Sequence, residues 1–446
     1  MDILTIEVGS TITKANAFAL LPEGRFEQWA QGFAETSIQE GDVCIGVENA
    51  LSALKANAPR ALENPQYFVN SSAAGGLRMT VHGLTFNMTA RAAREAALGA
   101  GAIIKQVTAG ELDDYDLKEI LDIQPNIILL AGGVDYGEKK IVLKNAEAIA
   151  SLGKIAPVIY AGNRAIRTQI REIFENAGVE LMLADNVFPA VDQLNIEPVR
   201  LIIHELFNKH IIHAPGMSRL RELTDAQVLP TPGAVLLGAK LFAEMLGDVL
   251  VIDVGGATTD VHSVSEGSLE WNKRMVDPEP VAKRTVEGDL GVFVNAQNIL
   301  ALAEDPAWEE EMQHLMAMPA TEQEMNLTRW LTQRAVETAI RRHAGVVTDL
   351  YTPSGKIKIV RGKDLTAVNW LVGTGGALTR VSGGEAILKA ICLGAGAYLL
   401  PKPETAVLID EYYRFSALGT LAHTYPEEVK ATFVHWVNET TEQKKD

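Results

Sequence analysis

The ten residues Val251–Asp260 constrain the fold of this chain more than any other stretch. An apolar, mostly β-branched run that contains Asp253 is typical of a buried strand. The paired glycines Gly255–Gly256 allow positive φ and a close approach of the backbone to a ligand, and Thr258–Thr259 offer two hydroxyls. The stretch therefore predicts a strand that turns back around a phosphate. Asp253 and Asp260 stand at either end of the turn, placed to hold Mg²⁺ through water.

Related turns occur near both ends of the chain. Residues 4–14 again read as strand, carboxylate, glycine, hydroxyls and strand, with Glu7 as the carboxylate. Residues 370–378 form a strand that runs into a glycine-rich turn without a carboxylate, which is a loop that can lie against a nucleoside. A plain hairpin with a buried carboxylate would explain one such turn alone. Three of them favour a nucleotide site.

Three elements in this order resemble the actin, sugar kinase and Hsp70 ATPase superfamily, where they are the phosphate-1, phosphate-2 and adenosine loops. The resemblance implies an α/β fold, two-lobed and actin/Hsp70-like (ribonuclease H-like), with nucleotide in the interlobe cleft. We expect a first lobe over residues 1–213, a junction with a linking helix over 214–247 and a second lobe over 248–446. A weak echo between the halves indicates a duplicated fold. The segment Thr285–Gly291 falls where the superfamily places a helix start near the nucleotide.

Composition excludes several other classes. The chain has 446 residues, 47% of them hydrophobic, and a formal charge of −17 without a long basic run, which disfavours nucleic acid and anionic membrane surfaces as partners. Cys44 and Cys392 are the only cysteines, so a disulfide framework or an iron–sulfur site within one chain is not expected. No apolar run of about 18 residues or leader-like start is present, and we expect a cytoplasmic protein.

The middle of the chain alternates strands with helices, which predicts a parallel sheet with ligand-facing loops at the strand ends. Asp135 and Asn163 follow two of these strands and are candidates for orienting water or a ligand. The ordinary polar end of a strand is the alternative. A zinc site at the histidines near residue 210 is disfavoured because no fourth ligand stands at a supporting spacing. Helices are expected over residues 42–57, 90–98 with Thr89 as cap, 143–152, 165–177, 187–206, 234–246, 328–343 and 386–400, with another opening at Gly291.

A closer resemblance emerges from stretches that a bare ATPase fold does not require. Together they are similar to the glutamate mutase accessory protein family called MutL or GlmL, which is distinct from the mismatch-repair protein. The stretches are Asn70–Met79 with the alanine-rich helix after it, Leu129–Asp135, Val158–Asn163, Pro230–Val235, Arg284–Gly291 and Leu371–Leu378. The resemblance implies an ATP-dependent chaperone or reactivating factor for an adenosylcobalamin-dependent mutase of amino-acid fermentation. Glutamate, ornithine and lysine mutases remain open as clients, as does a homodimer.

The same resemblance implies roles for individual residues, with ATP and Mg²⁺ as cofactors. Glu7 and Asp253 would serve Mg²⁺ through water. Apart from the resemblance, Lys14 could reach a phosphate, and a solvated strand lysine is the alternative. Glu7 stands where the superfamily usually has aspartate, so we expect a slow ATPase switch. Phosphate contacts are expected at Gly9, Ser10, Thr11, Gly255, Gly256, Thr258 and Thr259, and nucleoside contacts at Gly373, Gly375 and Gly376, with Glu287 and Gly288 nearby.

Other functions of the same superfamily stay open. A small-molecule kinase needs an aspartate base, for which Asp135 is the one candidate, and this residue joins Glu7 and Asp253 as a catalytic candidate. An actin-like filament protein is the second alternative, although no exposed apolar segment marks a filament contact. An iron–sulfur dehydratase activator is disfavoured by the two scattered cysteines. The base-off motif Asp-x-His-x-x-Gly is absent, so stable binding of cobalamin to this chain is not expected.

Overall fold

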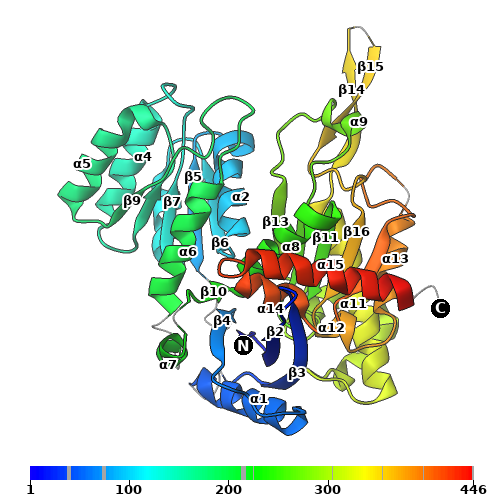
Figure 1. Cartoon of the computed structure of the whole chain (residues 1–446). Coiled ribbons are helices and arrows are strands. Elements are labelled where there is room, and N and C mark those ends of the chain that lie inside the picture. The colour runs from blue at the N-terminus through cyan, green and yellow to red at the C-terminus, as the bar shows by residue number, and fades with distance from the viewer. Residues whose placement is uncertain are drawn as a thin grey trace. The chain divides into compact units, whose positions relative to one another are not determined.

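The computed structural model describes residues 1–37, 42–72, 77–211, 217–224, 226–303, 305–353, 355–394 and 396–443. The chain divides into two compact units, whose elements Figure 1 labels. The larger unit comprises Met1–Ala74, Ile212–Val276 and Val281–Asp446, and the smaller unit comprises Gly75–Ile211 and Asp277–Pro280. The predicted lobe boundaries at residues 213 and 248 stay a prediction. Among the described residues, no helix is both long and apolar enough to cross a membrane.

The larger unit begins with a five-stranded sheet of order β10-β4-β1-β2-β3. Its first three strands form an antiparallel meander, and β4 and β10 add to it in parallel. Asp42 caps the helix that follows the meander, since its side chain accepts a hydrogen bond from the Cys44 amide. The elements are β1 (Asp2–Val8), β2 (Ile12–Leu20), β3 (Phe26–Glu35), α1 (Val43–Asn57), β4 (Gln66–Ser71) and β10 (Leu229–Pro230).

A second five-stranded sheet of the larger unit, of order β13-β12-β11-β16-β17, repeats this plan. It too has an antiparallel meander of three strands, to which two strands add in parallel. The repeat of order and direction confirms the predicted duplication and the α/β, ribonuclease H-like fold of the actin and Hsp70 ATPases. The strands are β11 (Val249–Val254), β12 (Thr259–Val264), β13 (Ala282–Glu287), β16 (Trp370–Thr374) and β17 (Ala406–Ile409).

One helix follows the last strand of each sheet, and these two helices cross at glycines. They are α8 (Thr231–Leu246) and α14 (Arg414–Leu421). A Cβ on Gly238 would lie 2.8 Å from the Phe415 carbonyl oxygen, and one on Gly419 would clash with the Ala234 carbonyl oxygen. Each helix therefore approaches the backbone of the other through a glycine. Beside this crossing, Phe242, Phe415 and Phe433 pack with ring centroids 5.0–5.4 Å apart.

Helices cover both sheets of the larger unit. Thr321 and Glu324 form a capping box at the start of the long helix α11, whose buried face joins the core under the second sheet. Hairpin β14–β15 pairs only with itself over its length, apart from short bridges at its base. The remaining elements are α7 (Met217–Glu222), α9 (Leu269–Asn272), α10 (Ala296–Ala303), α11 (Glu322–His343), β14 (Val346–Thr352), β15 (Gly355–Arg361), α12 (Gly376–Thr379), α13 (Gly384–Cys392) and α15 (Pro426–Gln443).

The smaller unit is a parallel five-stranded sheet of order β6-β5-β7-β8-β9, as the alternation of strands and helices predicts. Tyr160 and Phe174 are fully buried in its core. Its strands are β5 (Arg78–Gly83), β6 (Ile103–Ala109), β7 (Ile127–Leu130), β8 (Val158–Tyr160) and β9 (Leu181–Leu183). Its helices are α2 (Arg91–Gly99), α3 (Asp114–Ile123), α4 (Lys140–Ser151), α5 (Arg167–Ala177) and α6 (Glu197–Ile211).

Some predicted boundaries in the smaller unit are wrong because tertiary hydrogen bonds prevail over local pattern. Thr89 lies inside a helical turn, Phe86–Ala90, where its Oγ1 accepts bonds from the Leu84 and Thr85 amides and caps no helix. The predicted helix 187–206 begins only at Glu197. Before it, the Val187 amide donates to the Ala161 carbonyl, which holds this segment against the end of β8.

Other differences lie in the larger unit. Residues 285–287, in the segment 285–291 where a helix start was expected, belong to β13, because the backbone of this strand pairs with β12 (Thr259–Val264). The helix expected to open at Gly291 begins at Ala296. The linking helix starts earlier than predicted, at Thr231, since Pro232 suits the first helical turn. The helix predicted over 386–400 ends at Cys392.

Candidate nucleotide site

The two carboxylate-bearing hairpins have the same local conformation. The Gly9 amide donates to the Ile12 carbonyl at 3.1 Å, and the Gly255 amide donates to the Thr258 carbonyl at 2.9 Å. In the strands that lead to these turns, Glu7 pairs with Lys14 and Asp253 pairs with Asp260. Each sheet therefore presents one tight glycine turn, with a carboxylate two residues before the glycine.

Both turns and the third glycine loop come together within the larger unit. A Cβ on Gly256 would lie 2.9 Å from Thr11 Oγ1. Gly375 has a φ of +87°, and a Cβ there would lie 2.5 Å from Asp253 Oδ1. Only glycine fits these two positions without displacing the neighbouring turn. The three elements that the sequence singled out are thus adjacent, although hundreds of residues separate them.

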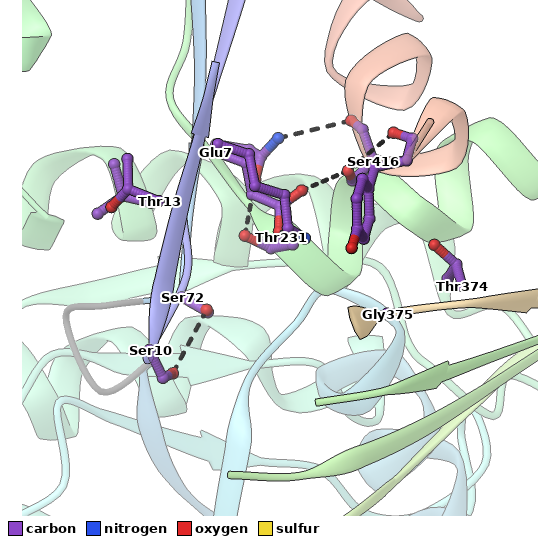
Figure 2. Close-up of polar contacts among 12 residues, drawn as sticks. Glu7, Ser10, Thr13, Ser72, Thr231, Thr374, Gly375 and Ser416 are labelled. Carbon is purple, nitrogen blue, oxygen red and sulfur yellow. Dashed lines mark hydrogen bonds and ion pairs between the residues drawn. The ribbon is translucent and has the colours of Figure 1, made fainter. Parts of the chain in front are cut away.

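Glu7 is buried and uses its two oxygens differently (Figure 2). Its Oε1 accepts a hydrogen bond from Lys14 Nζ at 2.6 Å, and its Oε2 accepts a very short one from Ser416 Oγ on α14. Lys14 Nζ also lies 4.0 Å from the centroid of the Tyr413 ring, a cation–π contact. Tyr413 directly precedes α14 and Ser416 lies within it, so this helix supports the first hairpin.

The charge at the site is unbalanced towards carboxylates. Burial raises the pKa of Asp253 to about 7; Lys14 opposes this shift, and Asp260, Glu7 and Asp410 add to it. Burial would lower the pKa of Lys14, but the Glu7 and Asp253 charges raise that pKa above its ordinary value overall. Asp260 has its own partner, the Arg284 guanidinium, at 2.6 Å. Lys14 therefore serves as counterion for two carboxylates at once.

A magnesium ion fits this arrangement. Mg²⁺ keeps several waters and takes one or two carboxylates together with substrate phosphates, instead of an all-protein cage. Across the residues that the structure describes, no cluster of three or more His, Cys, Asp or Glu side chains could hold a metal by itself. Glu7 and Asp253 beside two glycine turns are the donor set expected for a metal shared with phosphates. Burial and the neighbouring Asp260, Glu7 and Asp410 carboxylates disfavour the charged form of Asp253 and raise its pKa, and a bound cation would favour that charged form.

The predicted phosphate-contacting residues have different surroundings. Ser10 is exposed, and its Oγ lies 3.5 Å from Ser72 Oγ. Thr258 Oγ1 donates to Asp260 Oδ2 at 3.0 Å. Thr259 is fully buried and its hydroxyl donates to the Leu290 carbonyl at 2.7 Å, so this side chain holds the fold together. Phosphate contacts from the turn backbones stay a prediction.

The predicted nucleoside-contacting residues differ in the same way. A Cβ on Gly373 would lie 2.7 Å from a Leu388 methyl, so the side-chain position of this glycine faces the core. Gly376 opens α12, with the Tyr413 hydroxyl 3.9 Å from its Cβ position. Gly288 borders open space, while Glu287 accepts a 2.6 Å bond from Arg342. Burial raises the pKa of Glu287, although Arg342 acts in the other direction.

Asp135 lies in the smaller unit, where its carboxylate is occupied by internal contacts. Its Oδ1 accepts bonds from the Arg164 amide and from Asn186 Nδ2, both at 3.0 Å, and Oδ2 lies 3.3 Å from Arg164 Nε. Asn163 Oδ1 likewise accepts bonds from the Tyr136 and Ala165 amides at 2.9 Å. Through these contacts, Asp135 and Asn163 hold together the loops that follow β7 and β8. A catalytic role for Asp135 stays a prediction.

Two of the stretches discussed above fall partly outside the described residues. Gly75 and Gly76, in the small-residue run after β4, are among the undescribed positions, as is His213. His204 is buried within α6.

Sequence reasoning missed the residues that support the site from α14. Asp410 caps this helix: its Oδ1 accepts from the Arg414 amide at 2.8 Å and its Oδ2 from the Phe415 amide at 3.0 Å. Thr374 of β16 donates to the same carboxylate at 3.3 Å. An aspartate directly after a short apolar strand is a helix-start signal that could have indicated this cap. No local pattern links Ser416 to Glu7.

Comparison with known proteins shows a family match along nearly the whole chain. A family model described as MutL protein matches residues 3–437. Protein MutL of Clostridium tetanomorphum is 36% identical over 454 residues, which cover 95% of this chain and 96% of that protein. Both units therefore lie within the matched region.

Similar solved structures share little sequence with this chain. Nucleotide-free acetone carboxylase has a TM-score of 0.42 and 13% identity, and the match covers 94% of this chain and 70% of that one. The nucleotide-free diol dehydratase-reactivating factor has a TM-score of 0.38 and 14% identity, with 96% of this chain and 100% of that one covered.

Proposed function

Because the chain belongs to the MutL protein family, we propose that it is an ATP-dependent reactivating factor, or chaperone, for an adenosylcobalamin-dependent amino-acid mutase. One observation carries the ATP-dependent part: two glycine hairpins, each with a buried or half-buried carboxylate, meet a third glycine loop in one unit. The client is a glutamate mutase or an aminomutase. Cytoplasmic action is part of the proposal, supported by Cys44 and Cys392, which are buried and form no disulfide.

In this proposal, the residues of the site bind and orient nucleotide. The amides of Ser10 and Thr11 in the first turn and of Gly256 and Ala257 in the second donate to phosphate oxygens, and Lys14 adds a positive charge. Glu7 and Asp253 hold Mg²⁺ through water; when bound, this ion neutralises charge that develops on the phosphates. Asp253 is also the proposed catalytic carboxylate, placed to orient the attacking water.

The proposed output is a slow conformational switch. A nucleotide that contacts both hairpins favours the arrangement in which they are close, and loss of the terminal phosphate removes part of that preference. Only such a difference in binding free energy between the ATP and ADP states can drive release of a damaged cofactor from a client. Slow hydrolysis suits this task, because each nucleotide state must last long enough to act on a partner.

Reactivation of a damaged mutase tests the proposal. Glutamate, ornithine and lysine mutases are each inactivated with cyanocobalamin and then incubated with the protein, Mg-ATP and fresh adenosylcobalamin. We expect one mutase to regain activity with ATP and not with ADP, while D253N, with the Asp253 carboxylate removed, restores at least about tenfold less. Failure to restore any of the three mutases would contradict the reactivating role.

A further inference from the structure

We propose that Ser416 is a positioning residue that fixes the Glu7 carboxylate for magnesium-dependent nucleotide binding. The inference rests on the proposed nucleotide-binding function of this site. Glutamate has one more rotatable bond than the aspartate usual in the superfamily, so its carboxylate has more orientations to lose on binding. A side chain that holds one of its two oxygens removes that freedom in advance, which favours binding.

The hydrogen bonds of Glu7 match this role. Its Oε2 is taken by Ser416 Oγ, which leaves Oε1 as the oxygen that faces the positive charge of Lys14 at 2.6 Å. A serine hydroxyl has one proton, and Ser416 Oγ has a second acceptor near it, the Tyr413 carbonyl at 3.2 Å. A carboxylate paired with Lys14 is a stronger acceptor than a backbone carbonyl, so the Ser416 hydroxyl donates its hydrogen bond to Glu7. Ser416 thereby holds Oε2 and keeps Oε1 on the side of Lys14.

Hydrogen bonds before and after Ser416 hold its helix, α14, in place. Asp410 caps α14 and connects it to Thr374, which directly precedes Gly375. One turn after Ser416, Thr420 Oγ1 accepts a 2.6 Å bond from Asn70 Nδ2 on β4, the strand beside β1. Ser416 is therefore a donor on a fixed support, between the strand of the first hairpin and the third glycine loop (Figure 2).

Loss of the hydroxyl changes the balance at Glu7. Without a donor at Oε2, the carboxylate can rotate and give both oxygens to Lys14, which makes it less available to a magnesium-bound water. We expect S416A to raise the Mg²⁺ concentration for half-maximal ADP binding about 3- to 10-fold, the range for one typical net hydrogen bond. Affinity for ADP without Mg²⁺ is expected to stay within about twofold, because Ser416 does not contact nucleotide.

Calorimetric titration of ADP across a Mg²⁺ series tests this, with three comparison variants. S416T keeps a hydroxyl and should restore the wild-type Mg²⁺ dependence. S265A removes a buried serine hydroxyl elsewhere in the larger unit, bonded to Asp248, and should not shift it. E7D shortens the side chain so that it no longer reaches Ser416, and adding S416A to E7D should then have no further effect.

The outcomes separate this inference from the function on which it rests. If the wild-type protein binds ADP and S416A leaves the Mg²⁺ dependence unchanged, the role of Ser416 is contradicted while nucleotide binding stands. An equal shift in S265A, or a full additional shift in the E7D background, would also overturn it and indicate a general effect on folding. If the wild-type protein binds no ADP or ATP, both the inference and the proposed function fall.

Discussion

At the scale of single residues, the site depends on carboxylates whose charge the fold only partly compensates. Glu7 and Asp253 were predictable, because each stands two residues before a glycine turn in an apolar strand. Their shared counterion Lys14 was predicted as a phosphate contact and is bonded to Glu7 in the structure. Ser416 could not be predicted, since its contact joins residues 409 positions apart and requires the packed position of α14.

Asp253 predicts a pH dependence of stability. Its carboxyl has a pKa of about 7 in the folded chain against an ordinary value of 3.8, so between these values the folded state binds more protons than the unfolded state. Stability contributed by the protonated form is therefore lost as pH rises towards 7. We expect the thermal midpoint without ligand to fall between pH 5 and pH 8, and to fall less in D253N. Parallel curves for the two proteins in differential scanning calorimetry would contradict the assignment.

At the scale of elements, the hairpins and the long helix α11 were predictable because their signals are local. Alternating apolar residues, glycine turns and helix-capping side chains act within a few positions. The predicted helix cap at Thr89 was wrong because its hydroxyl accepts a bond from the Leu84 amide, between β5 and α2. The predicted start of α6 was wrong because the Val187 amide bonds to the Ala161 carbonyl after β8. The crossing of α8 and α14 depends on two glycines from distant parts of the chain, Gly238 and Gly419.

The helix crossing predicts a large effect from one added methyl group. G419A places a Cβ against the Ala234 carbonyl oxygen on α8, so the helices must separate. We expect a loss of about 1–3 kcal/mol or more in the free energy of unfolding. G288A is the matched control, since a Cβ there meets nothing within 4 Å. Denaturant unfolding measures both, and a G419A protein as stable as G288A would show that the crossing is looser than described.

At the scale of the whole molecule, the duplicated sheets and the parallel sheet of the smaller unit followed from the order of strand and helix patterns. The division into a larger and a smaller unit did not, because it depends on which segments pack together: residues 277–280 belong with the smaller unit although their chain neighbours belong to the larger. The family match spans residues 3–437 and so includes both. The decisive experiment therefore uses a protein that contains both units and looks for its partner.

Retention of a mutase from native extract tests the central claim most directly. The tagged full-length protein is bound to a support in parallel with Mg-ATP and with Mg-ADP, and D253N serves as the control whose nucleotide response is weakened. We predict that a cobalamin-dependent mutase is retained in one nucleotide state and released in the other, with a smaller difference for D253N. Absence of a mutase in both states, from a protein that still binds ATP, would contradict the proposed function.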